Sequence, residues 1–386
     1  MDPLAATIQD ELSAWLPRLI RLWRRESGSK WSDAPPDRLL PAEAKSVAAG
    51  LQRLSQGLTR ERQLAGEVYF SDPAQAGAYL LYFWPVSYAQ ARLALSLLPD
   101  PPCSVLELGS AAGPLSAAAA SLGCRNLHLV DRSAKALGWG RLLLQAEGAT
   151  VTVSQQDLSR NTRLAVGSYD LIAAQHLGNE LWLGDPGRPG KIAGMLSGLK
   201  DRLSGQGHLL LVEPALKNTS QAALQVRDRL LQNGWAARFP CLHQQPCPTL
   251  AAGDSCHAES EWSAPEAVHA LWQRAGLHKR ILKMTLLLFS PAVPESSGPE
   301  RWLAVSEPRR LRTREIEVLA CGAGQRVAFR LAPADAADAN RVLFKLKPGE
   351  IITLKGVAGE GTTRRLGPES RVERVSPARS GLQIRA

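Results

Sequence analysis

The stretch VLELGSAAGPLS at residues 105–116 decides the fold class of this chain. Its first residues are apolar and typical of a short buried strand, and its last residues are small and typical of a helix start. Between them, Glu107, Gly109 and Gly113 have the spacing E-x-G-x-x-x-G. Glycine lets a backbone approach a ligand closely, and a helix N-terminus presents free N–H groups. The stretch therefore predicts a ligand-binding turn between a strand and a helix.

Short apolar runs alternate with helical segments on the C-terminal side of this turn. The runs are NLHLVD at 126–131, TVTVSQQD at 150–157, YDLIAAQ at 169–175 and HLLLVEP at 208–214. Such alternation favours a parallel sheet with helices on both faces. We expect an α/β, doubly wound domain over residues 101–300, flanked by two regions of different character.

The flanking regions are predicted from periodicity. Within residues 1–100, apolar residues recur at three- and four-residue intervals, as in IQDELSAWLPRLIRLWRR at 8–25, and indicate helices. Pro85 is expected to kink or divide the apolar helical segment at 78–98. Residues 301–386 alternate with period two and predict a small, basic, β-rich region, with a hairpin turn at Pro348-Gly349.

Acidic residues follow two of the predicted strands. Asp131 ends the strand at 126–131, 24 residues after Glu107, and we expect it to face solvent and to accept hydrogen bonds from ribose hydroxyls. Asp157 follows the next strand. The dinucleotide fingerprint G-x-G-x-x-G is not matched. The Gly-rich turn and Asp131 together predict a nucleoside cofactor.

The same residues resemble those of class I methyltransferases. Such enzymes carry an acidic residue at the position of Glu107 and a residue near the adenine at the position of Asp157. The resemblance implies S-adenosylmethionine, bound by Glu107, Gly109, Gly113, Asp131 and Asp157. Ala111 stands where the middle glycine of their usual G-x-G-x-G would be, so weak or moderate binding is expected.

Four cysteines form the second candidate site. Cys241, Cys247 and Cys256 lie within sixteen residues of a Pro-rich loop, PCLHQQPCPTLAAGDSCH at 240–257, and Cys321 is the natural fourth ligand. Thiolates bind zinc or iron–sulfur clusters, and a distant residue can complete the set. Zinc remains a competing interpretation, because His243 or His257 can replace a thiolate. Disulfides would need an oxidising compartment, whereas Cys103 and Cys124 are expected in the core.

Charge and hydropathy limit the class of partner. The chain carries a net charge of +10, and residues 264–386 hold 21 Lys and Arg against 12 Asp and Glu. This excess predicts RNA binding, although a solvated basic face is the simpler alternative. The predicted RNA-binding residues are Arg309, Arg310, Arg312, Arg314, Arg364 and Arg365. No apolar run reaches about 18 residues and no basic signal segment opens the chain, so we expect a cytoplasmic or organelle-matrix protein without membrane contact.

Several segments together resemble one known family. They are YLLYFWPVSYAQARLAL, LELGSAAGPLS, HLGNEL, LLVEPA and above all the cysteine block, and they cover roughly residues 65 to 325. The chain resembles the mitochondrial ribosomal small-subunit methyltransferase-like proteins, the Rsm-twenty-two family, which also has bacterial members. Ser255 and Ala215 depart from the family pattern, but neither removes a ligand.

The resemblance implies a function. It implies a class I methyltransferase-like fold, association with the small ribosomal subunit and its rRNA during assembly, and a 4Fe-4S cluster on Cys241, Cys247, Cys256 and Cys321. We expect a monomeric assembly factor. An active rRNA methyltransferase is the alternative, but AAQHLGNEL at 173–181 lacks the N-P-P-aromatic base clamp. His176, Asn179 and Glu180 can line a pocket or form a turn. A zinc-stabilised protein-interaction module is the third possibility.

Overall fold

The computed structural model describes residues 3–28, 34–57, 70–160, 167–277, 279–291, 300–376, 378 and 381–386. The chain forms two compact units, each described here by itself. Unit 1 comprises Met1–Gly184, Arg202–Ser204 and Glu261–Leu282, and unit 2 comprises Asp185–Asp201, Gly205–Ser260 and Lys283–Ala386. Among the described residues, no helix is long and apolar enough to span a membrane.

Unit 1 contains the parallel strands that the alternating pattern predicted. Its strands are β1 (Ser104–Leu108), β2 (Asn126–Asp131), β3 (Thr150–Gln155) and β4 (Tyr169–Gln175), in the order β3-β2-β1-β4. Strand order reverses between β1 and β4, and ligands of doubly wound sheets bind at such a switch point, beyond the carboxyl ends of the strands. The helices α5 (Pro114–Ser121) and α6 (Ala134–Gln145) follow β1 and β2.

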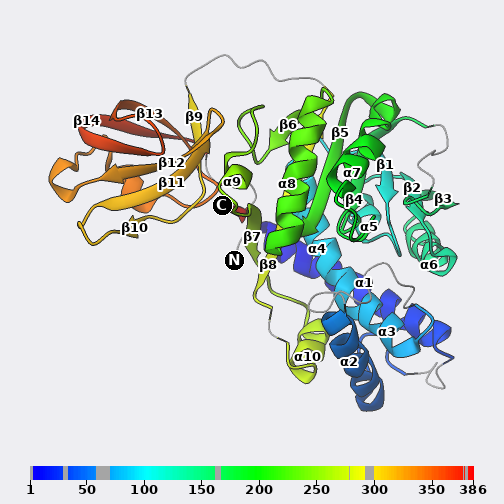
Figure 1. Ribbon diagram of the computed structural model, residues 1–386. Helices are drawn as coiled ribbons and strands as arrows, with labels where there is room; N and C mark the ends of the chain where they lie inside the picture. The colour runs from blue at the N-terminus through cyan, green and yellow to red at the C-terminus, as the bar shows by residue number, and fades with distance from the viewer. Residues whose placement is uncertain are drawn as a thin grey trace. The chain divides into compact units, whose positions relative to one another are not determined.

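The helical N-terminal region is present in unit 1. Its elements are α1 (Pro3–Glu26), α2 (Pro41–Ser55), α3 (Pro73–Ala78), the π-helical turn η2 (Tyr79–Phe83) and α4 (Trp84–Leu95); α10 (Glu266–Arg274) joins them. Pro85 stands in the first turn of α4, directly after the π-helical turn, so the segment is divided there as expected. Figure 1 shows these helices below the strands of the unit.

Unit 2 supplies the antiparallel part of the main sheet. It holds β5 (Leu203–Pro214), β6 (Ala236–Phe239), β7 (His257–Glu261), β8 (Ile281–Ser290) and β15 (Gln383–Arg385), with helices α7 (Arg188–Ser197), α8 (Lys217–Gln232) and α9 (Pro248–Ala251). The nine-stranded sheet has the order β15-β7-β8-β5-β4-β1-β2-β3, and β6 also pairs with β8. Since β8 runs antiparallel to β5, the sheet is mixed, and the fold is α/β as expected.

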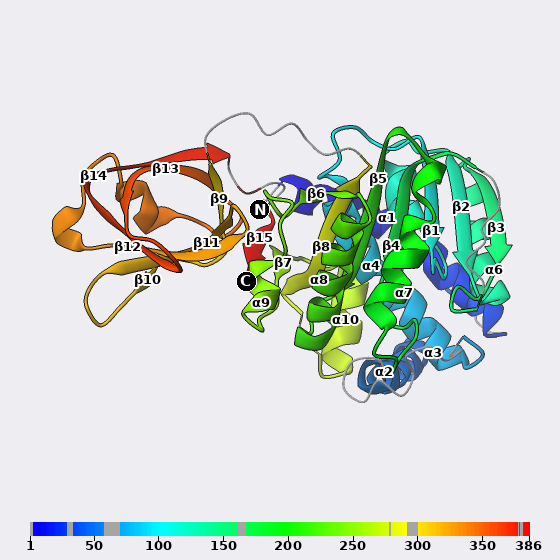
Figure 2. The same cartoon turned by 45° about the horizontal axis from the view of Figure 1, so that its top comes forward.

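The last third of the chain forms a second, six-stranded sheet in unit 2. Its strands are β9 (Arg301–Ala304), β10 (Arg309–Arg310), β11 (Ile316–Gly322), β12 (Gln325–Leu331), β13 (Ile351–Ala358) and β14 (Thr363–Ser376). Five of them close on themselves, because β11 and β13 both pair with β9, and Figure 2 shows the resulting barrel. Trp302, Phe329 and Leu343 are among the residues that fill its core.

The structure corrects two expectations. The segment before Pro348-Gly349 is not a strand of a hairpin but the 3-10 helix η5 (Arg341–Lys345), because Leu343 must turn into the barrel core. A second short 3-10 turn, η4 (Pro333–Asp335), precedes it, and η3 (Lys200–Arg202) precedes β5. Cys103 is exposed rather than buried, since it stands one residue before β1 begins, whereas Cys124 is buried as expected.

Candidate functional site

The Gly-rich turn at 109–113 connects β1 to α5 in unit 1. Gly109 and Gly113 have φ values of +65° and +68°, a left-handed conformation that costs glycine little. A Cβ atom on Gly109 would lie 2.7 Å from Cδ1 of Leu177, so space as well as conformation requires glycine there. Ala111 also has a positive φ, of 44°, which is uncommon for a residue with a side chain. The backbone of the turn is therefore strained at this residue.

Glu107 stabilises the turn from inside the unit. Its buried carboxylate accepts hydrogen bonds from the backbone N–H of Ser116 (2.9 Å), the Ser116 hydroxyl (2.6 Å) and the Leu115 N–H (3.3 Å). These groups belong to the first turn of α5, whose N–H groups lack helical partners. Burial nevertheless raises the pKa of Glu107 to about 7. Glu107 therefore caps the first turn of α5. Its contact with a cofactor stays a prediction.

Asp131 holds the turn from the neighbouring strand. Its Oδ2 accepts a hydrogen bond from the Ala111 N–H and its Oδ1 accepts one from the Ser133 N–H, both at 2.8 Å. Burial raises the pKa of this carboxyl. Asp131 is therefore half-buried and bonded to the chain, rather than the freely solvent-facing group that we expected, because the Gly-rich turn packs against it. It does lie beside that turn, where a ribose-binding carboxylate is required.

Asp157 lies beyond β3, at the same edge of the sheet. Its carboxylate accepts hydrogen bonds from the N–H (2.9 Å) and hydroxyl (2.6 Å) of Ser159. These bonds lower the pKa of Asp157 below its usual range. Since β1, β2 and β3 pair in parallel, the turn, Asp131 and Asp157 share the carboxyl edge of the sheet, as the sequence predicted.

Two aromatic residues that the sequence did not single out fasten the turn. The Tyr79 hydroxyl accepts a hydrogen bond from the Ala112 N–H at 3.2 Å, and Nε1 of Trp84 donates to the Ala112 carbonyl at 3.2 Å. Tyr79 begins the π-helical turn, and Trp84 follows directly after its last residue. Such turns are frequent at functional sites. The signal in the sequence was the aromatic cluster YLLYFW directly before Pro85.

His176 follows β4 at the same edge. It has a φ of 58°, its Nε2 lies 2.9 Å from Oε1 of Gln90, and its buried Nδ1 has no hydrogen-bond partner. Burial and the positive charge of Lys279 lower the pKa of His176 to about 4, so the ring is neutral near pH 7. The Asn179 amide donates to the His176 carbonyl at 2.5 Å, which confirms that this segment forms a hydrogen-bonded turn.

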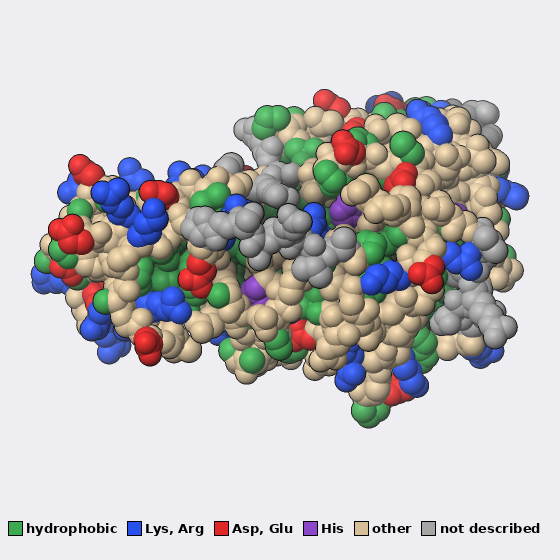
Figure 3. Space-filling view, turned by 90° about the horizontal axis from the view of Figure 1, so that it is seen from above, with side chains coloured by type: hydrophobic (Ala, Val, Ile, Leu, Met, Phe, Trp, Pro, Cys, Tyr) green, Lys and Arg blue, Asp and Glu red, His purple; other side chains and the backbone are tan. Residues whose placement is uncertain are grey.

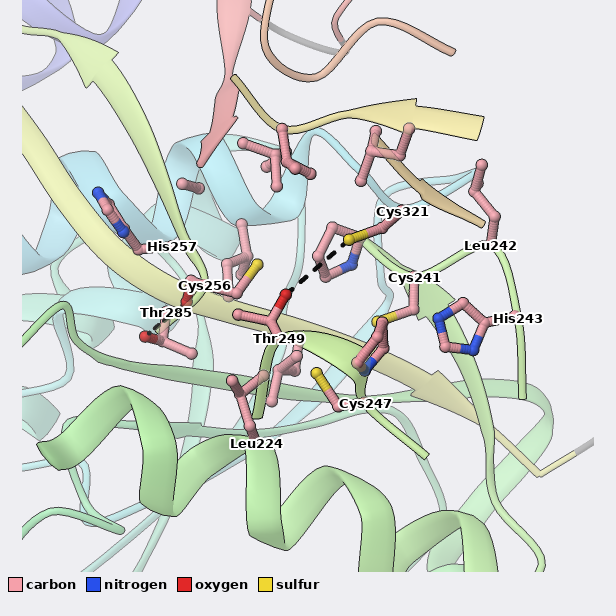
Figure 4. A pocket seen from close by; sticks show the side chains of 18 residues that line it. Leu224, Cys241, Leu242, His243, Cys247, Thr249, Cys256, His257, Thr285 and Cys321 are labelled. Carbon is pink, nitrogen blue, oxygen red and sulfur yellow. Dashed lines mark hydrogen bonds between the residues drawn. The ribbon is translucent and has the colours of Figure 1, made fainter. Parts of the chain in front are cut away.

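The four predicted cysteine ligands line one cavity in unit 2. Cys241, Cys247 and Cys256 come from the Pro-rich loop and Cys321 comes from β11, and Figure 4 shows their sulfur atoms directed into the same space. Apolar side chains complete most of the lining, among them Leu224, Leu286 and Ile384. All four cysteines are free thiols. The structure thus brings together residues that are up to 80 positions apart in the sequence.

The thiols are close enough to influence one another. Burial, and then the neighbouring thiols of Cys241, Cys321 and Cys247, raise the pKa of Cys256 well above its usual range. Burial likewise raises the pKa of Cys321 to about 12, although the Thr249 hydroxyl, 3.9 Å from its sulfur, opposes the change. In the absence of a ligand these thiols hold their protons, and a bound metal would displace them.

Helix α8 fastens the cysteine loop. The Cys247 N–H donates to both carboxylate oxygens of Asp228 at 3.1 Å, and the hydroxyl of Ser220 donates to the Cys256 carbonyl at 2.9 Å. Arg227 is fully buried and donates to the carbonyls of Gln245 (2.7 Å) and His243 (3.1 Å). Burial disfavours the charged form of Arg227, but the Asp228 carboxylate and the deprotonated forms of Cys241 and Cys247 favour it and together raise its pKa. A positive charge is therefore built in beside the thiols.

The two histidines of the zinc interpretation lie at the same cavity. Nδ1 of His243 accepts a hydrogen bond from the Gln245 N–H at 3.2 Å, and Nε2 of His257 lies 3.0 Å from Oε1 of Glu259. Burial lowers the pKa of His243 to about 4. Within the part of the chain that is described, no three His, Cys, Asp or Glu side chains are arranged to hold a single metal ion. The thiols surround a space instead of converging on one point.

The six predicted RNA-binding arginines all lie on the barrel and fall into two groups. One group is engaged within the barrel: Arg309 with Glu317, Arg365 with Glu315, and Arg364 with Gln325 and the Trp302 ring. The other group is exposed on the hairpin that joins β10 to β11, where Arg310 ends β10 and Arg312 and Arg314 lie in the turn. Figure 3 shows Lys and Arg side chains over the barrel, with Asp and Glu among them.

Comparison with protein families places the chain. The family described as mitochondrial small ribosomal subunit Rsm22 matches residues 73–278, which is more than half of the sequence. The chain belongs to the Rsm22 family. The matched range of this Rsm22-family chain includes the Gly-rich turn, Asp131 and three of the four cysteines, whereas Cys321 and the barrel lie outside it. A search of curated proteins finds no match.

Solved methyltransferase structures are similar to the Rsm22-family chain at low identity. The magnesium protoporphyrin IX methyltransferase ChlM from Synechocystis PCC 6803, solved with bound SAM, is 18% identical, with 64% of this chain and 97% of that chain covered and a TM-score of 0.34. The tRNA methyltransferase TrmK from B. subtilis is 16% identical, with 52% and 66% covered and a TM-score of 0.32. A methyltransferase from Pyrococcus furiosus is 11% identical, with 53% and 83% covered and a TM-score of 0.35.

Proposed function

We propose that this chain is an assembly factor of the small ribosomal subunit that contacts rRNA through its basic barrel. In this proposal the Gly-rich turn binds S-adenosylmethionine, and the four cysteines hold a 4Fe-4S cluster. The protein acts in the cytoplasm or an organelle matrix. Membership of the Rsm22 family supports the ribosomal role, since the family is described as a component of the mitochondrial small ribosomal subunit.

The observation that carries the proposal is the set of four thiols around one cavity. An iron–sulfur cluster with four irons is held by four cysteine thiolates, and this cavity offers that number from two distant segments. A zinc ion needs its ligands about 2.0–2.3 Å from one point. Among the described residues, no three His, Cys, Asp or Glu side chains are arranged around one point, so the zinc alternative rests on the sequence spacing alone.

The charge around the cavity also fits the cluster. Four thiolates together with a 4Fe-4S core carry a net negative charge, which is costly in an apolar, buried site. Arg227, buried and linked to Asp228, places a positive charge beside Cys241 and Cys247. The chain's own contribution is thus to orient the thiols, exclude water and offset their charge.

Support for S-adenosylmethionine comes from the carboxyl edge of unit 1. The turn at 109–113 offers backbone N–H groups at the start of α5, and Asp131 lies beside it. When bound, S-adenosylmethionine would supply an electrophilic methyl group at this edge. The residues of the chain would bind its nucleoside half and exclude water from it.

The cluster is tested by anaerobic purification of the full chain. We expect broad visible absorption, with iron and acid-labile sulfide in about equal amounts near four per chain, as such a cluster requires. Stoichiometric zinc without sulfide would refute the cluster and favour the zinc-stabilised module. Co-sedimentation with purified small subunits tests the ribosomal role, and failure of the cluster-loaded protein to co-sediment would refute it.

An active rRNA methyltransferase is the second candidate, and His176 is the observation that favours it. Its ring is neutral, buried and unpaired at Nδ1, and it lies beyond β4, next to the switch point of the sheet. Such a nitrogen can accept a hydrogen bond from the amino group of a base that is being methylated. Transfer of a labelled methyl group to small subunits by the wild type, lost in His176→Ala but kept in Asp100→Asn at an exposed position without a role in the proposed site, would establish this activity. No transfer by cluster-loaded protein would leave the assembly factor alone.

A further inference from the structure

The connectivity of the C-terminal barrel identifies its architecture. Strands β9, β11 and β12 follow one another as antiparallel neighbours, β14 pairs in parallel with β12, and β13 pairs with both β14 and β9. The 3-10 helices η4 and η5 lie between the third and fourth strands of this ring. A five-stranded Greek-key barrel with this order has the topology of an OB-fold. Figure 2 shows the closed ring.

OB-folds bind oligonucleotides on the face of their second and third strands, between the loop that joins strands one and two and the loop that joins strands four and five. In this barrel that face is formed by β11 and β12. The first loop runs from Val305 to Glu315 and includes β10, and the second covers residues 359–362. Topology alone does not establish function. The side chains on this face determine whether it can bind an oligonucleotide.

One end of the face belongs to the thiol cavity. Cys321 at the end of β11 points into that cavity, and its register partner Arg326 on β12 makes an ion pair with Asp254 of the cysteine loop at 2.7 Å. A Cβ atom on Gly324, in the turn between the two strands, would lie 2.8 Å from Cβ of Gln245. The cysteine loop therefore covers this end, and a nucleic acid can use only the other.

The other end carries a row of arginines. Strand register places Arg309 opposite Glu317, Glu317 opposite Arg330, and Arg330 opposite Arg365 across four adjacent strands. The side chains of Arg309 and Arg365 are 72% and 68% exposed, whereas that of Glu317 is 6% exposed. Glu317 is thus held beneath two arginines, at 2.6 Å from Arg309 and 2.8 Å from Arg330. The exposed layer of this row is positive.

A hairpin extends this positive surface. Arg309 and Arg310 of β10 pair with β11, and the turn is closed by hydrogen bonds from the Leu311 N–H to the Glu315 carbonyl (2.9 Å) and from the Arg314 N–H to the Leu311 carbonyl (3.0 Å). Arg314 has a φ of 67°, a conformation uncommon for arginine. Within the described part of the chain, no ion pair engages Arg310, Arg312 or Arg314. Three unneutralised charges therefore lie on one short, ordered hairpin.

The face lacks the aromatic residues on which bases usually stack. The outward positions of its two strands are Glu317, Leu319 and Cys321 on β11, and Arg326, Ala328 and Arg330 on β12. In other single-strand binders, stacking of bases on aromatic side chains supplies much of the affinity. Without it, recognition here must come from phosphate contacts. Binding is then expected to be salt-dependent and nearly independent of base sequence.

We propose that the β10–β11 hairpin and the adjacent arginine row form a binding site for the phosphate backbone of single-stranded RNA. This inference rests on the proposed rRNA contact and refines it in two ways. The free cations Arg310, Arg312 and Arg314 grip phosphates, whereas Arg309 and Arg365 shape the row through their ion pairs. The bound strand is confined to the end of the barrel face that the cysteine loop leaves open.

The test uses the full chain, cluster-loaded, and a fluorescein-labelled single-stranded RNA of about 20 nucleotides, followed by fluorescence anisotropy over a salt series. Changing Arg310, Arg312 and Arg314 together to Gln should weaken binding about 10- to 100-fold at low salt. It should also lower the slope of log affinity against log salt by about 2, since each single-strand phosphate contact contributes about 0.7. Uridine-rich and adenosine-rich strands should bind within a few-fold of each other.

A matched control removes the same charge from another wall of the barrel. Arg301, Lys355 and Arg371 are exposed on β9, β13 and β14, where Lys355 and Arg371 are register partners. Changing these three to Gln should reduce affinity less than threefold. If the control variant loses as much affinity as the hairpin variant, binding follows net charge and the inference is overturned. Equal or tighter binding of a duplex of the same length would also overturn it.

Co-sedimentation with small subunits separates this inference from the proposed function. A wild-type protein that does not co-sediment refutes the ribosomal role, whatever its affinity for free RNA. If the wild type co-sediments and the hairpin variant binds both RNA and subunits normally, only the hairpin site is refuted. A hairpin variant that keeps its RNA affinity but loses the subunit would show that the hairpin contacts a ribosomal protein, which also overturns the inference.

Discussion

The Gly-rich turn of unit 1 and the thiol cavity of unit 2 satisfy their polar groups in opposite ways. In the turn, Glu107 and Asp131 accept five hydrogen bonds from the chain itself. At the cavity, the backbone around the cysteines is well bonded, but among the described residues the four sulfur atoms make a single hydrogen bond, the long contact of Cys321 with Thr249. The turn is complete without a ligand, whereas the cavity is not.

The difference teaches how each site should depend on its ligand. A preorganised turn binds a cofactor without having to be ordered first, which favours affinity. The bound cofactor then stabilises the folded chain only modestly, by mass action. Buried thiols with raised pKa values, such as Cys256 and Cys321, stay protonated until a metal replaces their protons. At such a site, the free energy of ligand binding therefore contributes directly to the free energy of folding. Loss of the ligand should therefore affect unit 2 much more than unit 1.

The largest effect is expected for Cys247→Ser. Cys247 is buried and its N–H is fixed by Asp228, so a serine would keep the backbone bond but lose a ligand. We expect loss of most iron and sulfide and destabilisation by about 4 kcal/mol or more, as for other lost metal sites. Iron analysis and thermal unfolding measure these. Cys103→Ser, at the exposed cysteine, is the control and should change neither.

Arg227→Gln sharpens the comparison, because it alters the cavity without touching a thiol. It leaves Asp228 without its buried partner and removes donors from two loop carbonyls, which should cost about 3 kcal/mol. Iron content should fall and the cluster should become more sensitive to oxygen. Arg229→Gln lies two residues further along α8 at an exposed position and should behave as wild type. Equal iron in the two variants would mean that the Arg227 charge does not stabilise the cluster.

Asp131→Asn tests the turn. An amide N–H would face either the Ala111 or the Ser133 N–H, so one backbone donor loses its acceptor at a cost of about 1–3 kcal/mol. Cofactor affinity, measured by calorimetry, should fall about tenfold or more because both the turn and the ribose acceptor are affected. Asp157→Asn, at a carboxylate that bonds Ser159 and pairs with the exposed Arg160, should cost less than about 1 kcal/mol of stability. Undiminished affinity in Asp131→Asn would argue against cofactor binding at this turn.

Glu107→Gln is expected to leave iron content unchanged, and its effect on stability is best seen as a pH dependence. The pKa of Glu107 is about 7 in the folded chain, above its ordinary value of 4.5. The folded state thus binds more protons between those values, so stability is highest below about pH 4.5 and falls as pH rises towards 7, by at most about 3 kcal/mol. The substitution should remove this part of the slope in denaturant unfolding at several pH values. An unchanged slope would mean that Glu107 is not the group responsible.

Much of this molecule follows from local sequence patterns. The turn at 105–116 and the strand ends at Asp131 and Asp157 could be placed because strand and helix periodicities fix which residues meet the carboxyl edge of a parallel sheet. The four cysteines could be grouped because thiols in a Pro-rich loop have few structural uses. The sequence thus implied that the four thiols meet, and they do line one cavity. The nature of the ligand is a proposal.

Other features depend on tertiary contacts that no local pattern encodes. RVLFK at 341–345 alternates like a strand, yet it forms a 3-10 helix because Leu343 packs into the barrel core. The burial of Asp131 under Ala111 depends on the unusual φ of that residue. The six arginines look equivalent in sequence, but carboxylates at positions 315 and 317 engage two of them. Tyr79 and Trp84 contact the Gly-rich turn only because the fold brings these two segments together.

The wall of the thiol cavity also sets an order of events during synthesis. Ile384 lines the cavity from β15, which pairs with β7 directly after Cys256, so residues from 241 to 384 must all be available before the cavity closes. Three of the cysteines leave the ribosome long before Cys321 and longer still before Ile384. For that interval they are reactive thiols without their enclosure, open to oxidants and to stray metals. If the proposed cluster is bound, its insertion into the closed cavity would therefore follow translation of β15.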